Sequence, residues 1–455
     1  MKGQLPPDQN TLFYDFSLER HIPKDHLLRH IDQFLDFDQI HQHLQPFYSH
    51  TGRPSIDPEL LIRMLLIGYC YGIRSERRLC DEVNFNLAYR WFCRLGLEDK
   101  IPDHSTFSKN RHGRFRESDL LRFVFDTVVQ RCMEEGLVQG EGFAIDASLV
   151  PADVNRQRAV SRGKPIDWGP AEKQSRPVRE YLEGLEASSV PKSEPKSVSL
   201  TDPSSRWTAA KGPAFFAYSN NAIVDVANGI TMDVEATPAN RTDEVQSTKT
   251  LLERIESTHQ IKPKRLMGDT AYGAGANLDY LVNDKGIEPH IPVIDKSGRD
   301  DGTYSIAEFT WIAEDNEYRC PRHKRLHTTG NVTAQDTLLF RSRNKECAVC
   351  PDKHKCCPST PNRRIERSLY EESRNIARTI NRSAAYNTRT FHERKKVEMS
   401  FAHMKRHLNL TRLRLRGLSG ANDEFLMVAT ALNLRKLARL CGQPPPKQWI
   451  AVSGV

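Results

Sequence analysis

The chain has 455 residues, too many for one compact core, so we expect two or three domains. Charged residues make up 27% and hydrophobic residues 38%, a globular balance, and no run approaches the roughly 18 apolar residues that a membrane helix needs. The N-terminus has no apolar core and no small-residue cleavage site, which predicts a cytoplasmic protein whose ten cysteines stay reduced unless they hold metal.

The net charge of +8 is unevenly distributed along the chain. Residues 361–416 hold 15 Lys and Arg against 5 Asp and Glu, a local excess of ten positive charges. Such a basic segment is the electrostatic pattern expected of a protein that binds phosphate backbones. The alternative interpretation is a basic face that is merely solvated.

Residues 1–138 are predicted to form a helical N-terminal domain for DNA binding or dimerisation, with apolar residues at helical spacing from about 17 onward. Asp57 and Pro58 are typical of an N-cap and a first helical position. Asp103 is expected to cap a basic helix that carries Lys109, Arg111 and Arg114. Short helices followed by a basic one are typical of a helix-turn-helix, and a plain dimerisation bundle is the alternative.

A short strand, GFAIDASLV, begins at Gly142 and carries Asp146. An acid inside an apolar strand needs a reason, because an unpaired buried charge is costly. Asp146 is therefore either a salt-bridged structural residue or a metal ligand.

Residues 155–211 are rich in Ser, Pro, Lys and Glu and poor in aliphatic residues, which predicts a flexible insertion. Order returns with two predicted strands, at about 214–225 and 230–237. They flank Asn228-Gly229, which is a strong hairpin signal.

A helix is predicted to open at Asp243, and the segment 262–293 then has the pattern strand, glycine-rich turn, helix, strand. Asp269 stands at the end of the first of these strands. Ligands and catalytic groups gather at the carboxyl ends of strands in open α/β sheets, which favours a functional role over helix capping.

A cysteine-rich insert is predicted at 301–362, with Cys320-x-x-His323 and Cys347-x-x-Cys350 as two knuckle-like pairs. A reducing compartment disfavours disulfides, and two such pairs about 25 residues apart suit tetrahedral zinc. We expect a structural zinc ion, with free thiols as the alternative. Its predicted ligands are Cys320, Cys347, Cys350 and Cys356, with His323 or Cys357 as substitutes.

Helices return over 363–442, and the prolines that follow predict a disordered tail at 443–455. Within this region 391–408 is predicted to be one helix with two adjacent stripes, each within an arc of roughly 60°. The apolar stripe consists of Val397, Phe401, Met404 and Leu408, and the polar stripe of Phe391, Arg394, Glu398 and Lys405. Glu398 thus lies at the edge of the apolar face, unless the polar flank is simply solvated.

Three isolated acids, Asp146, Asp269 and Glu398, each lie at the edge of a predicted element. Bringing three carboxylates together is costly unless a divalent cation neutralises them. Mg²⁺ takes hard oxygen ligands, and two such ions can activate water, stabilise a leaving 3′ oxygen and support in-line displacement at phosphorus.

At these residues the chain resembles the DDE transposases of bacterial insertion sequences, in the branch marked by the signature Y-x2-R-x3-E-x6-K. The matching blocks are Ile145-Asp146-Ala147-Ser148, Asp269-Thr270-Ala271-Tyr272 and Phe391-x2-Arg394-x3-Glu398-x6-Lys405. Phe391 replaces the usual tyrosine, which keeps a ring for stacking but loses the hydroxyl.

The resemblance implies an α/β fold: a ribonuclease H-like mixed sheet flanked by helices, with an all-α N-terminal domain and a Cys-rich insert. The catalytic domain would begin at 139–300 and finish at 363–442. The resemblance implies Mg²⁺ or Mn²⁺ as cofactor, held by Asp146, Asp269 and Glu398 as catalytic residues. It also implies DNA contacts from Arg394 and Lys405, to which the basic segment adds Arg412, Arg414 and Arg416.

The expected function is transposition: binding of terminal inverted repeats of a mobile element, metal-dependent strand cleavage, and strand transfer into target DNA. The expected partner is double-stranded DNA, bound by a homodimer or higher oligomer in the bacterial nucleoid, with no membrane partner. The alternatives are a transposase-derived DNA-binding protein without catalysis, which the presence of all three acids disfavours, and a stand-alone nuclease of the same fold. Hydrolysis at the cysteine cluster is disfavoured because no suitably spaced general base lies nearby.

Overall fold

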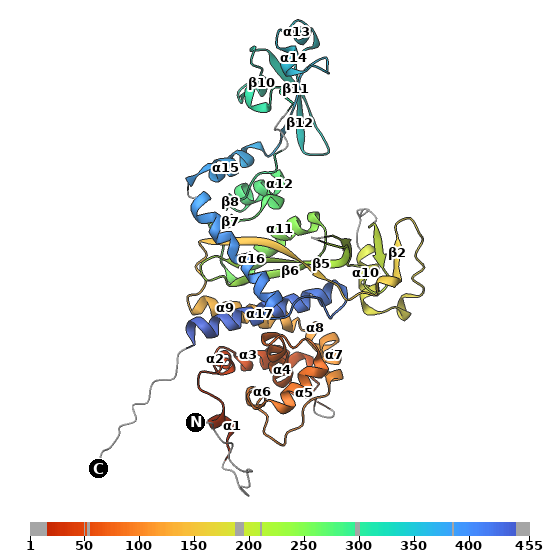
Figure 1. Ribbon diagram of the computed structural model, residues 1–455, viewed down its shortest axis with the longest axis vertical. Coiled ribbons are helices and arrows are strands. Elements are labelled where there is room, and N and C mark those ends of the chain that lie inside the picture. Colours follow the sequence, from red (N-terminus) through yellow and green to blue (C-terminus); the bar gives the residue numbers. More distant parts are fainter. Residues whose placement is uncertain are drawn as a thin grey trace, which may run out of the picture.

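The computed structural model describes residues 16–49, 51, 55–186, 195–209, 212–295, 301–384 and 386–442. Part of the predicted insertion, 187–194, and the predicted tail at 443–455 lie outside the described residues. Along the long axis of the molecule, N-terminal helices are followed by a layer built around a sheet and then by the cysteine-rich segment (Figure 1).

The N-terminal part is helical, as predicted. Asp57 accepts a hydrogen bond from the Glu59 N–H with Pro58 next in the chain, and Asp103 accepts one from the Ser105 N–H, so both predicted caps are confirmed. The helices are α1 (Leu18–His21), α2 (Leu27–Asp32), α3 (Phe37–Leu44), α4 (Pro58–Cys70), α5 (Glu76–Phe85), α6 (Leu87–Phe92), α7 (His104–His112), α8 (Arg114–Glu117) and α9 (Leu120–Glu134).

The central sheet is mixed. Its strands are β1 (Gly142–Pro151), β4 (Arg206–Thr208), β5 (Phe215–Asp225), β6 (Thr231–Pro238), β7 (Arg265–Met267) and β8 (Glu288–His290). Apart from the short β4, the order is β6-β5-β1-β7-β8, antiparallel on the β5 side of β1 and parallel on its β7 side. That is third, second, first, fourth, fifth along the chain, the arrangement of a ribonuclease H-like sheet, which confirms the predicted fold class.

The hairpin between β5 and β6 turns at the predicted dipeptide, where Gly229 has φ +71°, a conformation that glycine adopts without strain. The helix after β6 begins at Arg241, two residues before the predicted start, because Asn240 rather than Asp243 caps it. Asn240 accepts a hydrogen bond from the Asp243 N–H.

Helices cover the sheet, which in Figure 1 lies between α11 (Arg241–His259) and the pair formed by α9 and α17 (Gly417–Cys441). Further helices are α12 (Gly275–Asp279), α15 (Glu371–Arg382) and α16 (Phe391–Arg406). One continuous hydrophobic core runs from the N-terminal helices through the sheet to α17. The N-terminal helices are therefore packed on the sheet layer as part of the same core.

The cysteine-rich segment forms a separate module with a small core of its own. Its five antiparallel strands are ordered β13-β12-β11-β10-β9, and it extends beyond α12 and α15 in Figure 1. The elements are β9 (Thr310–Ile312), β10 (Glu317–Arg319), β11 (Arg325–Val332), β12 (Thr337–Arg341), α13 (Asn344–Ala348), α14 (Lys353–Cys356) and β13 (Arg364–Ser368).

The insertion after β1 contains more structure than its composition predicts. Its described part holds β2 (Ala159–Ser161), α10 (Arg176–Glu186) and β3 (Ser197–Ser199), and it supplies β4 to the central sheet. Polar contacts with the central sheet hold the insertion in place. Asp202 is fully buried and accepts a hydrogen bond of 2.5 Å from the Tyr218 hydroxyl on β5. The sequence has too few aliphatic residues to indicate such docking.

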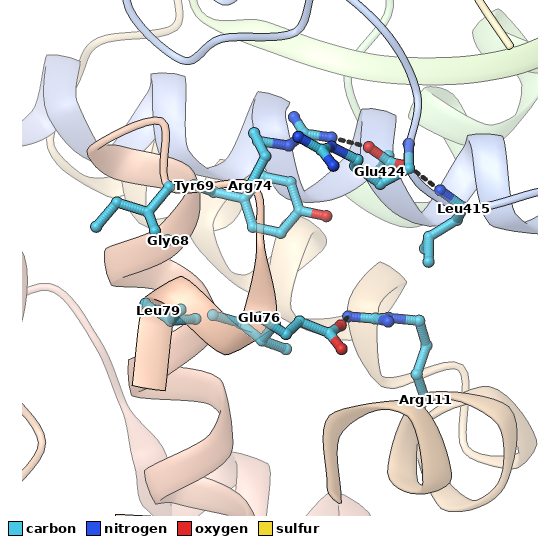
Figure 2. A pocket seen from close by; sticks show the side chains of 11 residues that line it. Gly68, Tyr69, Arg74, Glu76, Leu79, Arg111, Leu415 and Glu424 are labelled. Carbon is cyan, nitrogen blue, oxygen red and sulfur yellow. Dashed lines mark hydrogen bonds and ion pairs between the residues drawn. The ribbon is translucent and has the colours of Figure 1, made fainter. Parts of the chain in front are cut away.

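A buried ion pair joins the N-terminal helices to the C-terminal helix. Arg74, between α4 and α5, pairs with Glu424 on α17, whose side chain is 1% exposed (Figure 2). The same carboxylate accepts hydrogen bonds from the backbone N–H groups of Arg414 and Leu415. Burial lowers the pKa of the Arg74 guanidinium. Glu424 thus holds three segments together: α17, the loop after α4 and the basic segment before α17.

Replacing Glu424 by Gln should lower the free energy of unfolding by about 3–5 kcal/mol, because the buried Arg74 loses its counter-charge. Chemical denaturation of the full chain measures this change. Glu134→Gln is the matched control, because it removes an exposed pair with Arg131 and should cost less than about 1 kcal/mol. Equal stability of the two variants would show that the buried pair does not secure this junction.

Candidate active site

Asp146 lies in the middle of β1, which pairs with β5 on one side and β7 on the other. Its carboxylate accepts a hydrogen bond of 2.8 Å from the N–H of Ala147. The pKa of Asp146 is raised to about 6, mainly by burial and also by the charges of Asp269 and Glu398, against the opposing effects of the Ala147 N–H and Arg394. The three predicted acids therefore share one electrostatic neighbourhood.

Asp269 is placed by the parallel pairing of β7 with β1. Ala144 is in register with Met267, so Asp146 and Asp269 each lie two residues beyond the same pair. Asp269 also caps the short turn that follows, accepting a hydrogen bond of 2.7 Å from the N–H of Ala271. Asp269 thus both caps this turn and lies at the end of a strand, so the two interpretations of this residue are compatible.

The loop after Asp269 can only turn as it does with glycine at position 273. A side chain there would collide with the carbonyl oxygen of Pro292, on the segment that follows β8. This close approach fixes the path of the chain beyond the strand that carries Asp269.

Helix α16 presents Glu398 beside the sheet. The predicted apolar stripe is confirmed, because Val397, Phe401, Met404 and Leu408 are all buried, and α16 packs on β1. The Glu398 side chain is 51% exposed and forms a loose ion pair of 3.7 Å with Arg394, one turn earlier. Docking of one helical face thus leaves the adjacent polar face open toward the acids.

The side chains as placed do not yet form a closed metal site. Within the part of the chain that the structure describes, no three His, Cys, Asp or Glu side chains are arranged to hold one metal ion. This holds for the three acids and for the cysteine-rich module alike.

The basic residues predicted to contact DNA differ in their surroundings. Lys405 is half-buried and donates a hydrogen bond of 3.2 Å to the Leu149 carbonyl of β1, and burial lowers its pKa. The guanidinium of Arg394 lies 6.0 Å from the centre of the Phe391 ring, which is 49% exposed. The side chains of Arg412, Arg414 and Arg416 are exposed.

Arg412 and Arg416 share a partner that the sequence did not indicate. Arg412 donates to one Asp153 oxygen at 3.0 Å, and Arg416 donates to the other at 3.0 Å. Because these partners are more than 250 positions apart along the chain, no local pattern could have revealed the contact. Glu424 was detectable in principle, since it is an acid within the apolar helix α17.

The basic side chains predicted on the helix after Asp103 are less exposed to solvent than the sequence indicates. Arg111 on α7 is 6% exposed and pairs with Glu76, and the Arg114 guanidinium lies 4.3 Å from the centre of the Tyr48 ring. Lys109 remains exposed. The helix-turn-helix interpretation therefore stays a prediction.

The two cysteine pairs of the module lie on neighbouring segments. Arg322, between Cys320 and His323, donates two hydrogen bonds to Asp352, two residues after Cys350, at 2.7 and 3.0 Å. Cys356 and Cys357 are buried in the small core of the module, and Cys347 packs against that core.

Two family models match the chain. One, described as Transposase domain (DUF772), matches residues 16–113, and the other, described as Transposase DDE domain, matches residues 139–434. The second match covers more than half of the chain, so the chain belongs to the family of DDE transposases. The predicted resemblance is confirmed. Enzymes of this class cleave and join DNA and generally use divalent metal ions.

Among solved structures, the chain is similar to a piggyBac transposase, seen by cryo-electron microscopy in a synaptic complex with hairpin DNA. The identity is 9%, the match covers 91% of this chain and 74% of that chain, and the TM-score is 0.32.

In the described residues, no helix is both long and apolar enough to cross a membrane.

Replacing Phe401 by Ala should lower the free energy of unfolding by about 3–5 kcal/mol, because this ring anchors α16 in the core. Met399→Ala is the matched control on the same helix: its side chain is 55% exposed, so the change should stay within about 0.5 kcal/mol. Denaturant titrations compare the two variants. A Phe401→Ala protein as stable as the control would mean that α16 faces the sheet differently.

Proposed function

We propose that this chain is the transposase of a bacterial insertion sequence. It binds the terminal inverted repeats of its element, cleaves DNA strands there, and joins the freed 3′ ends to target DNA as a homodimer or higher oligomer. The observation that carries the proposal is the shared register of Asp146 and Asp269 on adjacent parallel strands, with Glu398 electrostatically coupled to them.

The three carboxylates are suitable ligands for Mg²⁺ or Mn²⁺. All three side chains offer hard carboxylate oxygens, and the raised pKa of Asp146 reflects a buried, like-charged group that a cation would compensate. Asp146, Asp269 and Glu398 would hold the metal. When bound, the metal would supply Lewis-acid activation of water and of the leaving oxygen. Glu398 is free to turn toward the other acids, because its ion pair with Arg394 is long.

The remaining site residues bind and orient DNA. Phe391 offers an exposed ring at the start of α16, and Arg394 follows one turn later. Lys405 places a positive charge beside β1, and the basic segment adds Arg412, Arg414 and Arg416. These cations position phosphates, while the acids carry the chemistry.

Asp269→Asn should abolish metal-dependent strand cleavage and leave DNA affinity within about twofold, because it removes a ligand charge and not a phosphate contact. The assay uses duplexes carrying the element ends, with Mg²⁺ or Mn²⁺. Asp284→Asn, at an exposed position that ends the helical segment Tyr280–Asp284 before β8, is the control and should cleave normally. Cleavage by Asp269→Asn at the wild-type rate would refute its assignment.

Two alternatives have distinct outcomes in the same assays. A wild-type protein that binds the ends but never cuts them is a transposase-derived DNA-binding protein. A protein that cuts but never joins a pre-cut 3′ end to target DNA is a nuclease.

We also propose that the cysteine-rich module holds a structural zinc ion. The Arg322–Asp352 contact brings the Cys320 and Cys347–Cys350 segments together, and Cys356 adds a buried thiol. The pKa of Cys356 is raised to about 12, mainly by burial and also by Cys357 and Cys347, so thiolates here need a cation. The ligands would be Cys320, Cys347, Cys350 and Cys356, with His323 or Cys357 as substitutes.

Elemental analysis of the purified full chain should therefore find about one zinc ion per chain. Cys347→Ser should lose most of it and destabilise the module, whereas Cys441→Ser, at the end of α17, should retain it. A wild-type protein with almost no zinc after preparation without chelators would exclude this site.

A further inference from the structure

Two hollows adjoin each other beside the basic segment. One, of about 320 Å³, is lined by Arg74, Asp153, Arg412 and Arg414 among others. The other, of about 490 Å³, is lined by Asp153, Arg176, Arg179, Arg414 and Arg416 among others. Because Asp153 and Arg414 line both, the two hollows form one depression, which we call the arginine groove.

The groove has more positive charge than its surroundings neutralise. It is lined by six arginines and one carboxylate, that of Asp153. Arg74 and Arg176 have acidic partners outside the lining, Glu424 and Glu180. Arg179 and Arg414 form no ion pair with any residue that the structure describes.

The pKa of a neighbouring histidine reflects the same positive electrostatic potential. His112 lines the second hollow, and its pKa is lowered to about 4, first by burial and then by the charges of Arg176, Arg116 and Arg111. A site that disfavours a further cation favours an anion.

Three distant parts of the chain build the groove. Arg74 comes from the N-terminal helices, Arg176 and Arg179 come from α10 of the insertion, and the others come from the segment between α16 and α17. This last segment is held at the end of β1, where the Leu413 N–H donates to the Pro151 carbonyl at 2.8 Å.

The groove is also close enough to the acids for one DNA duplex to reach both. Pro151 follows Asp146 by five positions on the same strand, which corresponds to roughly 17 Å, about half a helical turn of B-DNA.

Asp153 joins two arginines of the groove. Its two carboxylate oxygens each accept a hydrogen bond from an exposed arginine, Arg412 and Arg416. The Asp153 side chain is itself 31% exposed, so these pairs are accessible to solvent and contribute little stability. A phosphate offers the same two-oxygen recognition with charge-assisted hydrogen bonds, so it can replace the carboxylate.

We propose that the arginine groove binds the phosphate backbone of double-stranded DNA, and that Asp153 occupies a phosphate position in the free protein and is displaced when DNA binds. The inference rests on the proposed function, since it takes DNA to be the ligand. It adds α10 of the insertion to the DNA-binding surface and makes Asp153 a built-in competitor that restrains binding.

The test measures the affinity of the full chain for a short duplex of random sequence by fluorescence anisotropy, without divalent metal, over a series of salt concentrations. Asp153→Asn should bind roughly three- to tenfold more tightly than the wild type, because two arginines lose their internal partner. Asp167→Asn is the control: it removes the same charge from an exposed insertion residue that lines neither hollow, and affinity should change less than about twofold.

A second pair of variants tests the groove without touching Asp153. Arg179→Gln should weaken binding and reduce the slope of log K against log salt by about 0.9, the value for one phosphate contact. Arg158→Gln, at an exposed position of the same insertion outside both hollows, should leave the slope unchanged. Thermal unfolding confirms that each variant is folded.

The outcomes separate this inference from the proposed function. Unchanged or weaker binding by a folded Asp153→Asn, with normal binding by the wild type, overturns the role of Asp153 and leaves the transposase proposal intact. If Asp153→Asn does not fold, the Arg179→Gln and Arg158→Gln pair decides, and equal slopes overturn the groove. A wild-type protein that binds no DNA overturns both proposals.

Discussion

The architecture depends on one buried carboxylate. Glu424 joins Arg74 of the N-terminal helices to α17, and it also binds the backbone N–H groups at the end of the basic segment. A buried acid is tolerated only when it is paired and hydrogen-bonded, and here the Arg74 guanidinium pairs with it while two backbone N–H groups of the basic segment donate to it. The contact that docks the N-terminal helices therefore also fixes the position of Arg414 and the arginines near it. The arginine groove and the hydrophobic core thus depend on the same residue.

The acid site rests on a second constraint, the parallel register of β1 and β7. Strand pairing places Asp146 and Asp269 side by side without help from their own side chains, and α16 then brings Glu398 by burying the adjacent apolar stripe of the helix. Burial first, and then the charges of Asp269 and Glu398, raise the pKa of Asp146. Backbone geometry thus concentrates negative charge at the acid site, and the neighbouring arginine groove carries an excess of positive charge.

Local patterns were sufficient to predict much of this from the sequence. The Asn228-Gly229 turn, the cap at Asp57 and the buried stripe of α16 depend on residues within a few positions of one another. Prediction from the sequence failed where contacts between distant parts of the chain determine the structure. Arg111 looked like a surface cation but is buried against Glu76, and the insertion looked flexible but contributes β4 and α10. The pairing of Asp153 with Arg412 and Arg416 joins opposite ends of the catalytic domain.

The separate core of the cysteine-rich module has an evolutionary consequence. The module enters after β8 and leaves before α15, and its apolar side chains pack among themselves rather than into the main core. Mutations, insertions or even replacement of the module would therefore leave the β1–β7 register and the docking of α16 untouched. Changes in this module would therefore be tolerated more readily than changes in the strands and the helix that carry the three acids.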